Sequence, residues 1–231
     1  MSAIAIVGAG PGMGLAIART FAKQGFDVAL IARNRGKLDD LAATLTAEGV
    51  TAAAFPADVL DHDQLTQALR GAADRFGGID VLEYSPGGTA HSAARTVPSA
   101  TTPSDVHEQM DFQLYGAIAA TRAVLPAMRE AGTGTLLYTT GAGSVSPITM
   151  FGNINAAAAA LRNWVINLHG ELAGTGIQAA HVAIGVWIGT HGPEGAPTAT
   201  ADQIAPTYWD LHTHRDQAET VFTGAHQDQT R

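Results

Sequence analysis

A glycine-rich turn near the N-terminus has the clearest chemical use of any segment in the chain. Gly8, Gly12 and Gly14 follow the apolar run 3–7 and open a helical stretch. Glycines let the backbone turn sharply, and the free amide N–H groups at a helix N-terminus attract phosphate. Met13 stands where the six-residue dinucleotide fingerprint has its last glycine, so the spacing is G-x-x-x-G-x-G. In this strand–turn–helix setting the turn predicts a nucleotide site.

Two arginines follow the second apolar run and indicate which nucleotide binds. The sequence there is Ala32-Arg33-Asn34-Arg35, without the carboxylate that would hold a ribose 2′-hydroxyl. The planar guanidinium of arginine suits phosphate. Arg33 and Asn34 therefore predict NADP(H) rather than NAD(H). The alternative is that the arginines only solvate a loop.

Hydroxyl groups stand near the end of another predicted strand, at 135–140. Tyr138 and Thr140 lie toward its carboxyl end, where α/β sheets place ligands. Side chains alternate along a strand, so these two share one face and Thr139 has the other. Either hydroxyl can bond a substrate oxygen, which makes Tyr138 and Thr140 candidate catalytic residues. The alternative is a tyrosine packed in the core with its hydroxyl satisfied.

Histidines offer a second source of acid–base chemistry. His91 and His191 each follow a predicted strand, so both are candidates to approach a substrate. His212 and His214 have a spacing that can bind a metal, but no third ligand stands at a suitable distance in sequence. We therefore predict no metal site and interpret this pair as a solvated helix end.

The elements that must position these residues alternate along the chain. Apolar runs that predict strands occur at 3–7, 28–31, 51–55, 79–84, 135–140, 177–188 and 220–223. Helical patterns occur at 12–24, 36–48, 60–75, 104–130, 153–172 and 201–212. Apolar strands that each precede a helix predict a parallel sheet covered on both faces. We expect one doubly wound α/β domain over 1–223, a mobile loop at 190–200, and a disordered tail at 224–231.

Composition excludes several classes of function. The 231 residues suit one domain; 46% are hydrophobic and 15% are charged. A net charge of −8 excludes a global polycation for nucleic acid. No apolar stretch reaches the roughly 18 residues that a membrane span needs. The absence of cysteine removes disulfides and thiolate nucleophiles. The N-terminus has no basic region typical of a signal peptide, so we expect a cytoplasmic protein.

Together these features resemble the short-chain dehydrogenase/reductase family, whose fold is a single Rossmann-type domain. The resemblance rests on the glycine turn at 8–14, on Asp58-Val59 after the third strand, and on the chain length. The segment GAIAATRAVLPAM at 116–128 resembles the family's fourth helix. Gly185 resembles the glycine after its sixth strand. The likeness extends over about residues 3–222.

The resemblance implies how the cofactor would be held. Asp58 would hydrogen-bond the adenine amino group, with Val59 beside the ring. Ser85, Pro86 and Gly87 would pass by the adenosine ribose and the nicotinamide, where the family usually has Asn-Ala-Gly. We add these residues and the family-like glycine at 185 to the predicted NADP(H) site.

The family's proton relay, a Tyr-x-x-x-Lys pair, has no counterpart in this sequence. Its physical basis is that a nearby ammonium helps a tyrosine with an ordinary pKa near 10 to ionise. The tyrosines are Tyr84, Tyr115, Tyr138 and Tyr208, and none has a lysine four residues later. Both lysines of the chain, Lys23 and Lys37, precede residue 40. No alignment can therefore recover the pair.

Aligning the helix at 153–172 with the family shows what stands in its place. Ile154 falls at the tyrosine position and Ala158 at the lysine position. The serine position falls on Gly141, or on Thr140 if the strand shifts by one residue. The asparagine position falls on Gln113, which becomes the third candidate catalytic residue.

These observations favour an NADP-dependent oxidoreductase with a non-standard active site. Its substrate would be a small organic carbonyl, alcohol, imine or enone. Alternatives are a non-redox lyase, isomerase or cyclase, or a catalytically silent nucleotide-binding protein on the same scaffold. The family likeness also implies a homodimer or homotetramer, paired through the helices at 104–130 and 153–172.

Overall fold

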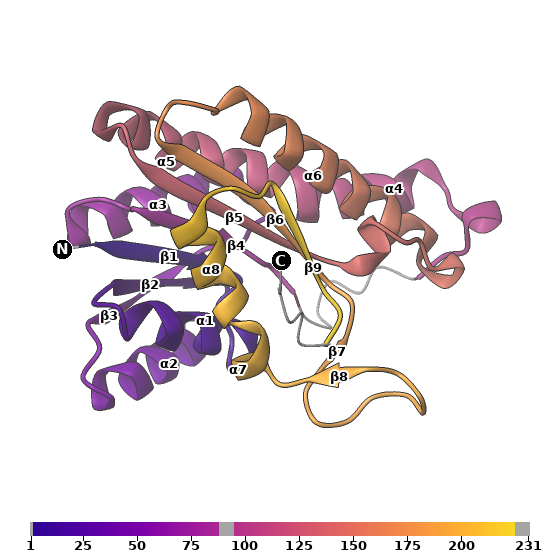
Figure 1. Ribbon diagram of the computed structural model, residues 1–231, viewed down its shortest axis with the longest axis horizontal. Coiled ribbons are helices and arrows are strands. Elements are labelled where there is room, and N and C mark those ends of the chain that lie inside the picture. The colour runs from indigo at the N-terminus through magenta and orange to yellow at the C-terminus, as the bar shows by residue number, and fades with distance from the viewer. Residues whose placement is uncertain (1, 88–94, 225–231) are drawn as a thin grey trace.

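A parallel sheet with the order β3-β2-β1-β4-β5-β6-β9 crosses the centre of the computed structural model (Figure 1). The structure describes residues 2–87 and 95–224. The strands are β1 (Ala3–Val7), β2 (Asp27–Ala32), β3 (Ala52–Pro56), β4 (Val81–Tyr84), β5 (Gly134–Gly141), β6 (Ile177–Ile184) and β9 (Glu219–Phe222). The apolar runs of the five inner strands are buried because helices cover both faces of the sheet, and the edge strands β3 and β9 are half-buried.

The helices alternate with the strands, as the sequence predicts. They are α1 (Met13–Ala22), α2 (Arg35–Ala47), α3 (His62–Phe76), α4 (Pro103–Met110), α5 (Gly116–Ala131), α6 (Gly152–Glu171), α7 (Ala201–Ile204) and α8 (Pro206–His214). A π-helical segment, η3 (Asp111–Tyr115), joins α4 to α5. Short 3-10 helices are η2 (Pro98–Ala100), η4 (Ala142–Ser144) and η5 (Thr149–Phe151).

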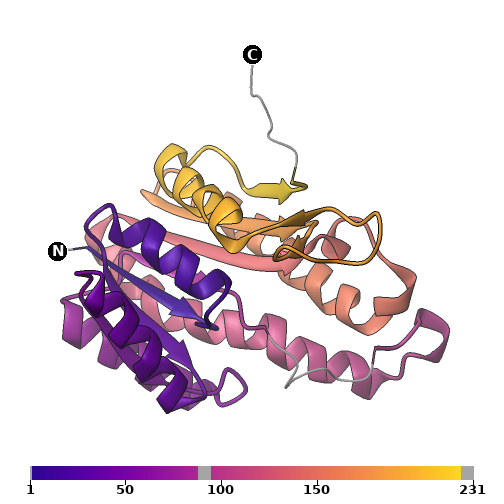
Figure 2. The ribbon, with the colours of Figure 1, turned by 90° about the horizontal axis from the view of Figure 1, so that it is seen from below.

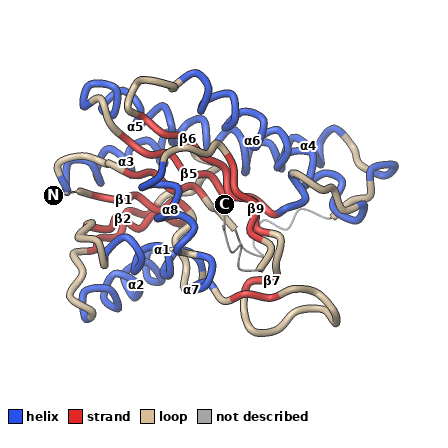
Figure 3. The backbone as a smooth tube through the Cα atoms, viewed as in Figure 1, coloured by secondary structure: helices blue, strands red, loops and turns tan. Residues whose placement is uncertain are grey.

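Two hydrophobic cores make the three layers that are visible edge-on in Figure 2. One core packs α3, α5 and α6 against the sheet, and the other packs α1, α2, α7 and α8 against its opposite face. The tube in Figure 3 shows the strands between these helices. Strand order reverses direction between β1 and β4. The predicted doubly wound α/β fold is confirmed, and ligands of such sheets bind at the carboxyl ends beside this reversal.

Three predicted boundaries are wrong at the C-terminal side. The strand predicted at 177–188 ends at Ile184, and the N–H of Gly185 makes the last bond to β9 by donating to the carbonyl of Phe222 (2.8 Å). Beyond it, β7 (Trp187–Ile188) pairs with β8 (Thr198–Ala199), so the loop predicted at 190–200 contains a strand.

The final helix, predicted over 201–212, is two helices. Pro206 begins the second of them, and a proline lacks the N–H that a continuous helix needs. Residues 225–231 of the predicted tail lie outside the described residues. No helix in the described part of the chain is long and apolar enough to cross a membrane.

Candidate cofactor and catalytic site

The turn after β1 is closed against the end of β4, and this contact requires glycine. Gly8 has φ +98°, which L side chains rarely adopt. A Cβ at Gly8 would lie 2.5 Å from the carbonyl oxygen of Ser85 and 2.6 Å from Cα of Pro86. The first glycine of the turn therefore sets the predicted nucleotide segments 8–14 and 85–87 side by side.

The other two glycines shape the N-terminus of α1. Gly12 is its N-cap, has no side-chain cap, and has open space where a Cβ would stand. A Cβ at Gly14 would lie 2.9 Å from Cα of Ala9, so the helix approaches the turn as closely as a glycine permits. Met13 is the first residue of the helix. This uncapped helix end, faced by open space, fits the phosphates of a nucleotide.

Three neighbouring residues after β2 differ in the contacts that their side chains make. Asn34 caps α2 by accepting a hydrogen bond from the N–H of Lys37 (3.0 Å). Arg35 pairs with Asp39 at 3.6 Å on the same helix. Arg33 is exposed and forms no hydrogen bond or ion pair with any other described residue. Of these three side chains, only that of Arg33 has no polar partner among the described residues and is available to bind a ligand.

The remaining predicted cofactor residues lie at the carboxyl end of the same sheet. Asp58 receives the N–H of Leu60 on Oδ1 (3.1 Å), which fixes its carboxylate at the end of β3. Val59 is buried against the start of α5. Pro86 and Gly87 continue from β4, and Gly185 follows β6 as described above. These residues, like those of the glycine turn and those after β2, stay predictions as cofactor contacts.

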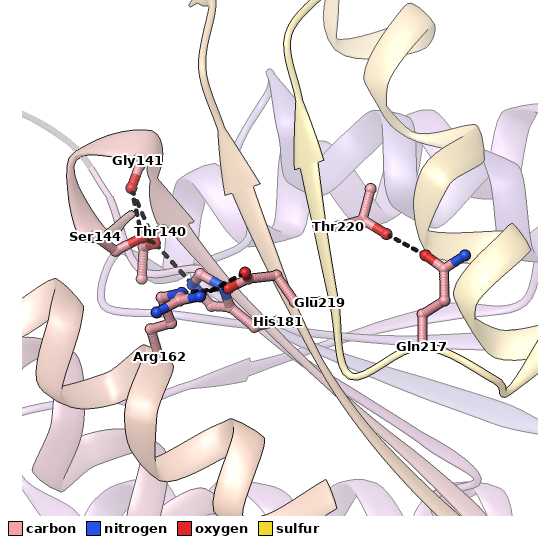
Figure 4. A network of polar contacts seen from close by, with 8 residues as sticks. All are labelled: Thr140, Gly141, Ser144, Arg162, His181, Gln217, Glu219 and Thr220. Carbon is pink, nitrogen blue, oxygen red and sulfur yellow. Dashed lines mark hydrogen bonds and ion pairs between the residues drawn. The ribbon is translucent and has the colours of Figure 1, made fainter. Parts of the chain in front are cut away.

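Thr140 lies in a buried polar network at the carboxyl end of β5 (Figure 4). Its Oγ1 lies 2.8 Å from Nε2 of His181 on β6 and 2.9 Å from Oγ of Ser144 on η4. Nδ1 of His181 lies 3.0 Å from Oε1 of Glu219 on β9. Arg162 of α6 completes the chain by donating from Nη2 to Oε2 of Glu219 (2.7 Å). Thr140, Ser144 and His181 are all buried.

The charges in this network are matched. The hydrogen bond from Arg162 lowers the pKa of Glu219 below its ordinary value, so the carboxylate is ionised. Burial lowers the pKa of His181 below 6.5, against the opposing effect of Glu219. A neutral imidazole beside an ionised carboxylate carries its proton on the nitrogen that faces that carboxylate.

Tyr138, the second hydroxyl candidate, lies in the core. It shares the face of Thr140, as predicted, but its hydroxyl bonds Thr121 Oγ1 at 2.5 Å and its ring packs edge-on against Trp164. Burial raises its pKa far above the ordinary value of 10. These observations argue against Tyr138 as a proton donor and favour its core-packing alternative.

Gln113, the third candidate, lies within the π-helical segment η3. Its Nε2 donates to Oε1 of Gln109 (3.1 Å) and to the carbonyl of Ile154 (3.4 Å) in the first turn of α6. π-Bulges are frequent at functional sites. The carbonyl of Phe112 in the same segment accepts the hydroxyl of Tyr84 (2.8 Å). The Gln113 amide thus ties α6 to η3, and its catalytic role stays a prediction.

A second buried network lies on the other face of β5. Glu83 is fully buried in β4 and accepts the hydroxyls of Ser85 (2.9 Å) and Thr139 (3.0 Å). The oxygen of Thr139 in turn lies 2.7 Å from the hydroxyl of Tyr208. Burial raises the pKa of Glu83 to about 8. The acid is therefore mostly neutral at pH 7.

The histidines that stood out in the sequence are used differently. His212 packs among Phe21, Phe26 and Trp209, and its Nδ1 lies 2.9 Å from Thr135 Oγ1. The predicted solvated end thus holds only for exposed His214. Within residues 2–87 and 95–224, no group of three or more His, Cys, Asp or Glu side chains is arranged to hold a metal. His191 is exposed, and His91 lies outside the described residues.

Sequence reasoning missed His181, Glu219 and Glu83. His181 and Glu83 were detectable, because each is the one acidic or basic residue in an otherwise buried strand run. Such a residue needs a partner or a changed protonation state. Glu219 was missed because the last strand begins one residue earlier than the predicted run at 220–223.

The sheet order, the glycine turn and the open end of α1 define a doubly wound, Rossmann-type fold with an uncapped helix N-terminus beside the glycine turn. A short chain dehydrogenase family model matches residues 2–192, and the chain belongs to this family.

Particular relatives agree with this class. An uncharacterized oxidoreductase of Staphylococcus aureus (strain USA300) is 28% identical over 184 residues, which cover 78% of this chain and 76% of the relative. L-Sorbose reductase from Gluconobacter frateurii, solved with NADPH and L-sorbose, has a TM-score of 0.84 at 21% identity, covering 97% of this chain and 95% of that one. Acetoin dehydrogenase from Enterobacter cloacae has a TM-score of 0.86 at 21% identity, covering 96% and 94%. These two structures support the fold.

Proposed function

We propose that this short-chain dehydrogenase uses NADP(H) to interconvert a small organic carbonyl, imine or enone with its reduced form at a non-standard active site. The observation that carries the proposal is the turn at 8–14, closed by Gly8 against Ser85 while the N-terminus of α1 stays uncapped. The amide N–H groups of this helix end would hold the pyrophosphate. When bound, the nicotinamide supplies hydride chemistry.

Arg33 supports the choice of NADP(H). Its guanidinium is exposed and forms no ion pair with other described residues, whereas Arg35 is held by Asp39. A 2′-phosphate would give Arg33 a doubly hydrogen-bonded partner. NAD(H), which carries a hydroxyl there, would gain nothing comparable.

Thr140 is the hydroxyl that we propose for the substrate oxygen. It lies at the carboxyl end of β5, next to Gly141, and is bonded to an imidazole. Gln113 supports the site by holding the first turn of α6. The exposed apolar side chains of Val145, Ile148 and Met150 follow β5 and favour an apolar substrate body.

We also propose a homodimer or homotetramer. The exposed positions on the middle of α6 are small or uncharged: Ala156, Ala159, Asn163 and Asn167. Such a face can pack closely against a second helix. Light scattering that returns only a 23.8 kDa species at micromolar concentration would contradict this proposal.

Nucleotide binding and turnover test the main proposal directly. We expect NADPH to quench tryptophan fluorescence and to lose absorbance at 340 nm with members of a panel of aldehydes, ketones, imines and enones. Binding without turnover would favour a silent nucleotide-binding protein, and no binding at millimolar NADPH would contradict the proposal outright.

Arg33→Ala, with Arg35→Ala as its matched control, tests the cofactor preference. Losing a charged hydrogen bond to phosphate costs about 1.5–3 kcal/mol, so Arg33→Ala should weaken NADPH binding roughly 10–150-fold. NADH binding should change less than about threefold, and Arg35→Ala should spare both cofactors. Equal weakening of NADPH and NADH would contradict the 2′-phosphate assignment.

A further inference from the structure

We propose that Thr140, His181 and Glu219 form a hydroxyl–imidazole–carboxylate relay that moves the substrate proton. The inference rests on the proposed oxidoreductase function and names the groups that replace an ionisable tyrosine in it. Figure 4 shows the three side chains in line, from β5 through β6 to β9. Only Thr140 would touch substrate, and His181 and Glu219 would act through it.

The positions of the protons follow from the charges. Arg162 keeps Glu219 ionised, so the proton of the neutral imidazole lies on Nδ1, 3.0 Å from Glu219 Oε1. Nε2 is then an acceptor, and the hydroxyl of Thr140, 2.8 Å away, is the group that can donate to it. The same hydroxyl also donates to Ser144 Oγ (2.9 Å) and to the carbonyl oxygen of Gly141 (3.0 Å), so the relay requires its single proton to turn toward His181. The order carboxylate, imidazole and hydroxyl is that of the Ser-His-Asp triad, in which the imidazole activates the hydroxyl.

The groups around His181 fix the orientation of its imidazole. His181 is fully buried, and the charged groups that face it are Glu219 from β9 and Arg162 from α6. From β5, the hydroxyl of Thr140 contacts its Nε2, and that hydroxyl is in turn bonded to Ser144 of η4 and to the carbonyl of Gly141. A buried imidazole with both nitrogens bonded is held in one tautomer and one orientation. The imidazole is therefore oriented before substrate binds.

The proton transfers balance in the direction of alcohol oxidation. The alcohol proton passes to Oγ1 of Thr140 while the proton of Thr140 passes to Nε2 of His181. The C–H bond of the same carbon breaks, its electron pair leaves as hydride to oxidised nicotinamide, and the C–O bond becomes a carbonyl. When the carbonyl product has left, the imidazolium, stabilised by Glu219 until then, returns its Nε2 proton to Oγ1 of Thr140, and the hydroxyl proton of Thr140 passes to the water that replaces the product. Reduction reverses each transfer.

This scheme predicts opposite pH dependences for the two directions. Oxidation needs neutral His181 and therefore rises with pH through the pKa of His181, which burial places below 6.5. Reduction needs the imidazolium and falls over the same range. A purely structural imidazole would produce neither trend.

Variants at two adjacent threonines test the relay with the alcohol that turns over fastest with NADP⁺. Thr140→Val should lower kcat about 10²–10⁴-fold, the usual contribution of general acid–base catalysis, and Thr140→Ser should restore most of it. Thr139→Val, which removes the neighbouring hydroxyl on the opposite face, should keep kcat within about threefold. His181→Gln preserves hydrogen bonding without basicity. Its kcat should fall about 10²-fold, and it should lose the pH dependence of kcat below pH 6.5.

A readout in the cofactor-free protein complements the kinetics. In ¹⁵N NMR spectra, His181 should show a protonated Nδ1 and an unprotonated Nε2, and Thr140→Val should shift Nε2. Wild-type kcat and pH profile in a folded His181→Gln variant, or a proton on Nε2, would overturn the relay alone. An absence of any redox turnover in the wild type would instead overturn the proposed function, and the relay with it.

Discussion

Thr139 and Thr140 are neighbours in β5, yet each belongs to a different buried polar network on opposite faces of the sheet. Thr139 bonds Glu83 and Tyr208 under α8, and Thr140 bonds His181 under α6. Both networks contain a glutamate, and both lie near the carboxyl end of the strand. They differ in what stands opposite the carboxyl group.

The presence of a cation decides the protonation of each glutamate. Glu83 has only hydroxyl partners, so burial dominates and raises its pKa to about 8. Glu219 has Arg162 within hydrogen-bond distance, and its pKa is lowered. A neutral acid can hold neighbouring hydroxyls in place, whereas an ionised carboxylate can also stabilise an imidazolium. Proton transfer is therefore assigned to the face that carries the arginine.

The largest expected effect concerns Glu83→Gln. Because its folded pKa is raised above the ordinary 4.5, the native state binds an extra proton between about pH 4.5 and 8. Wild-type stability should fall as pH rises through this window, by up to about 1.4 kcal/mol per pH unit. Glu83→Gln lacks this loss. Between pH 5 and 9 its free energy of unfolding should therefore gain on the order of 3–5 kcal/mol relative to that of the wild type.

Urea unfolding at pH 5, 7 and 9 measures this difference. Glu48→Gln is the control, because Glu48 is exposed, pairs with Arg19 and has a lowered pKa, so it does not titrate in this window. Parallel stability curves for wild type and Glu83→Gln would show that Glu83 is ionised at pH 7. The distinction between the two faces would then fail.

A smaller effect is expected when the cation is removed from the other face. Arg162→Met leaves the carboxylate of Glu219 without its partner at a site where the two side chains are 32% and 20% exposed. Breaking a fully buried pair costs about 3–5 kcal/mol, so partial exposure reduces the expected loss to roughly 1–3 kcal/mol.

Arg129→Met provides the matched control for Arg162→Met. It breaks the exposed ion pair between Arg129 on α5 and Glu171 on α6, the helix that also carries Arg162. Exposed pairs of this kind contribute about 0–1 kcal/mol to stability. The Arg162→Met loss should also shrink below pH 4.5, because the lowered pKa of Glu219 stabilises the fold only while the carboxylate is ionised. Equal losses for the two variants at pH 7 would place the Arg162 pair among ordinary surface pairs.

The contrast also shows what the sequence can and cannot reveal. The glycine turn, the strand–helix alternation and the face shared by Tyr138 and Thr140 are local patterns, and the structure confirms them. The network of Thr140 joins elements up to 79 positions apart along the chain, from 140 to 219, so no local spacing encodes it. Its one local signal is an ionisable residue inside an apolar strand.

The smallest expected effect separates two hydroxyls on the same face. Tyr138→Phe removes the bond to Thr121 in the core, which should cost about 0.5–1.5 kcal/mol of stability. The raised pKa of Tyr138 disfavours its ionisation, and its ring is fully buried, so kcat should change less than about threefold. Thermal unfolding and steady-state kinetics measure the two quantities on one preparation. A loss of kcat comparable to that of Thr140→Val would show that Tyr138 takes part in the reaction. A hydroxyl that serves only packing leaves the rate of the chemical step unchanged.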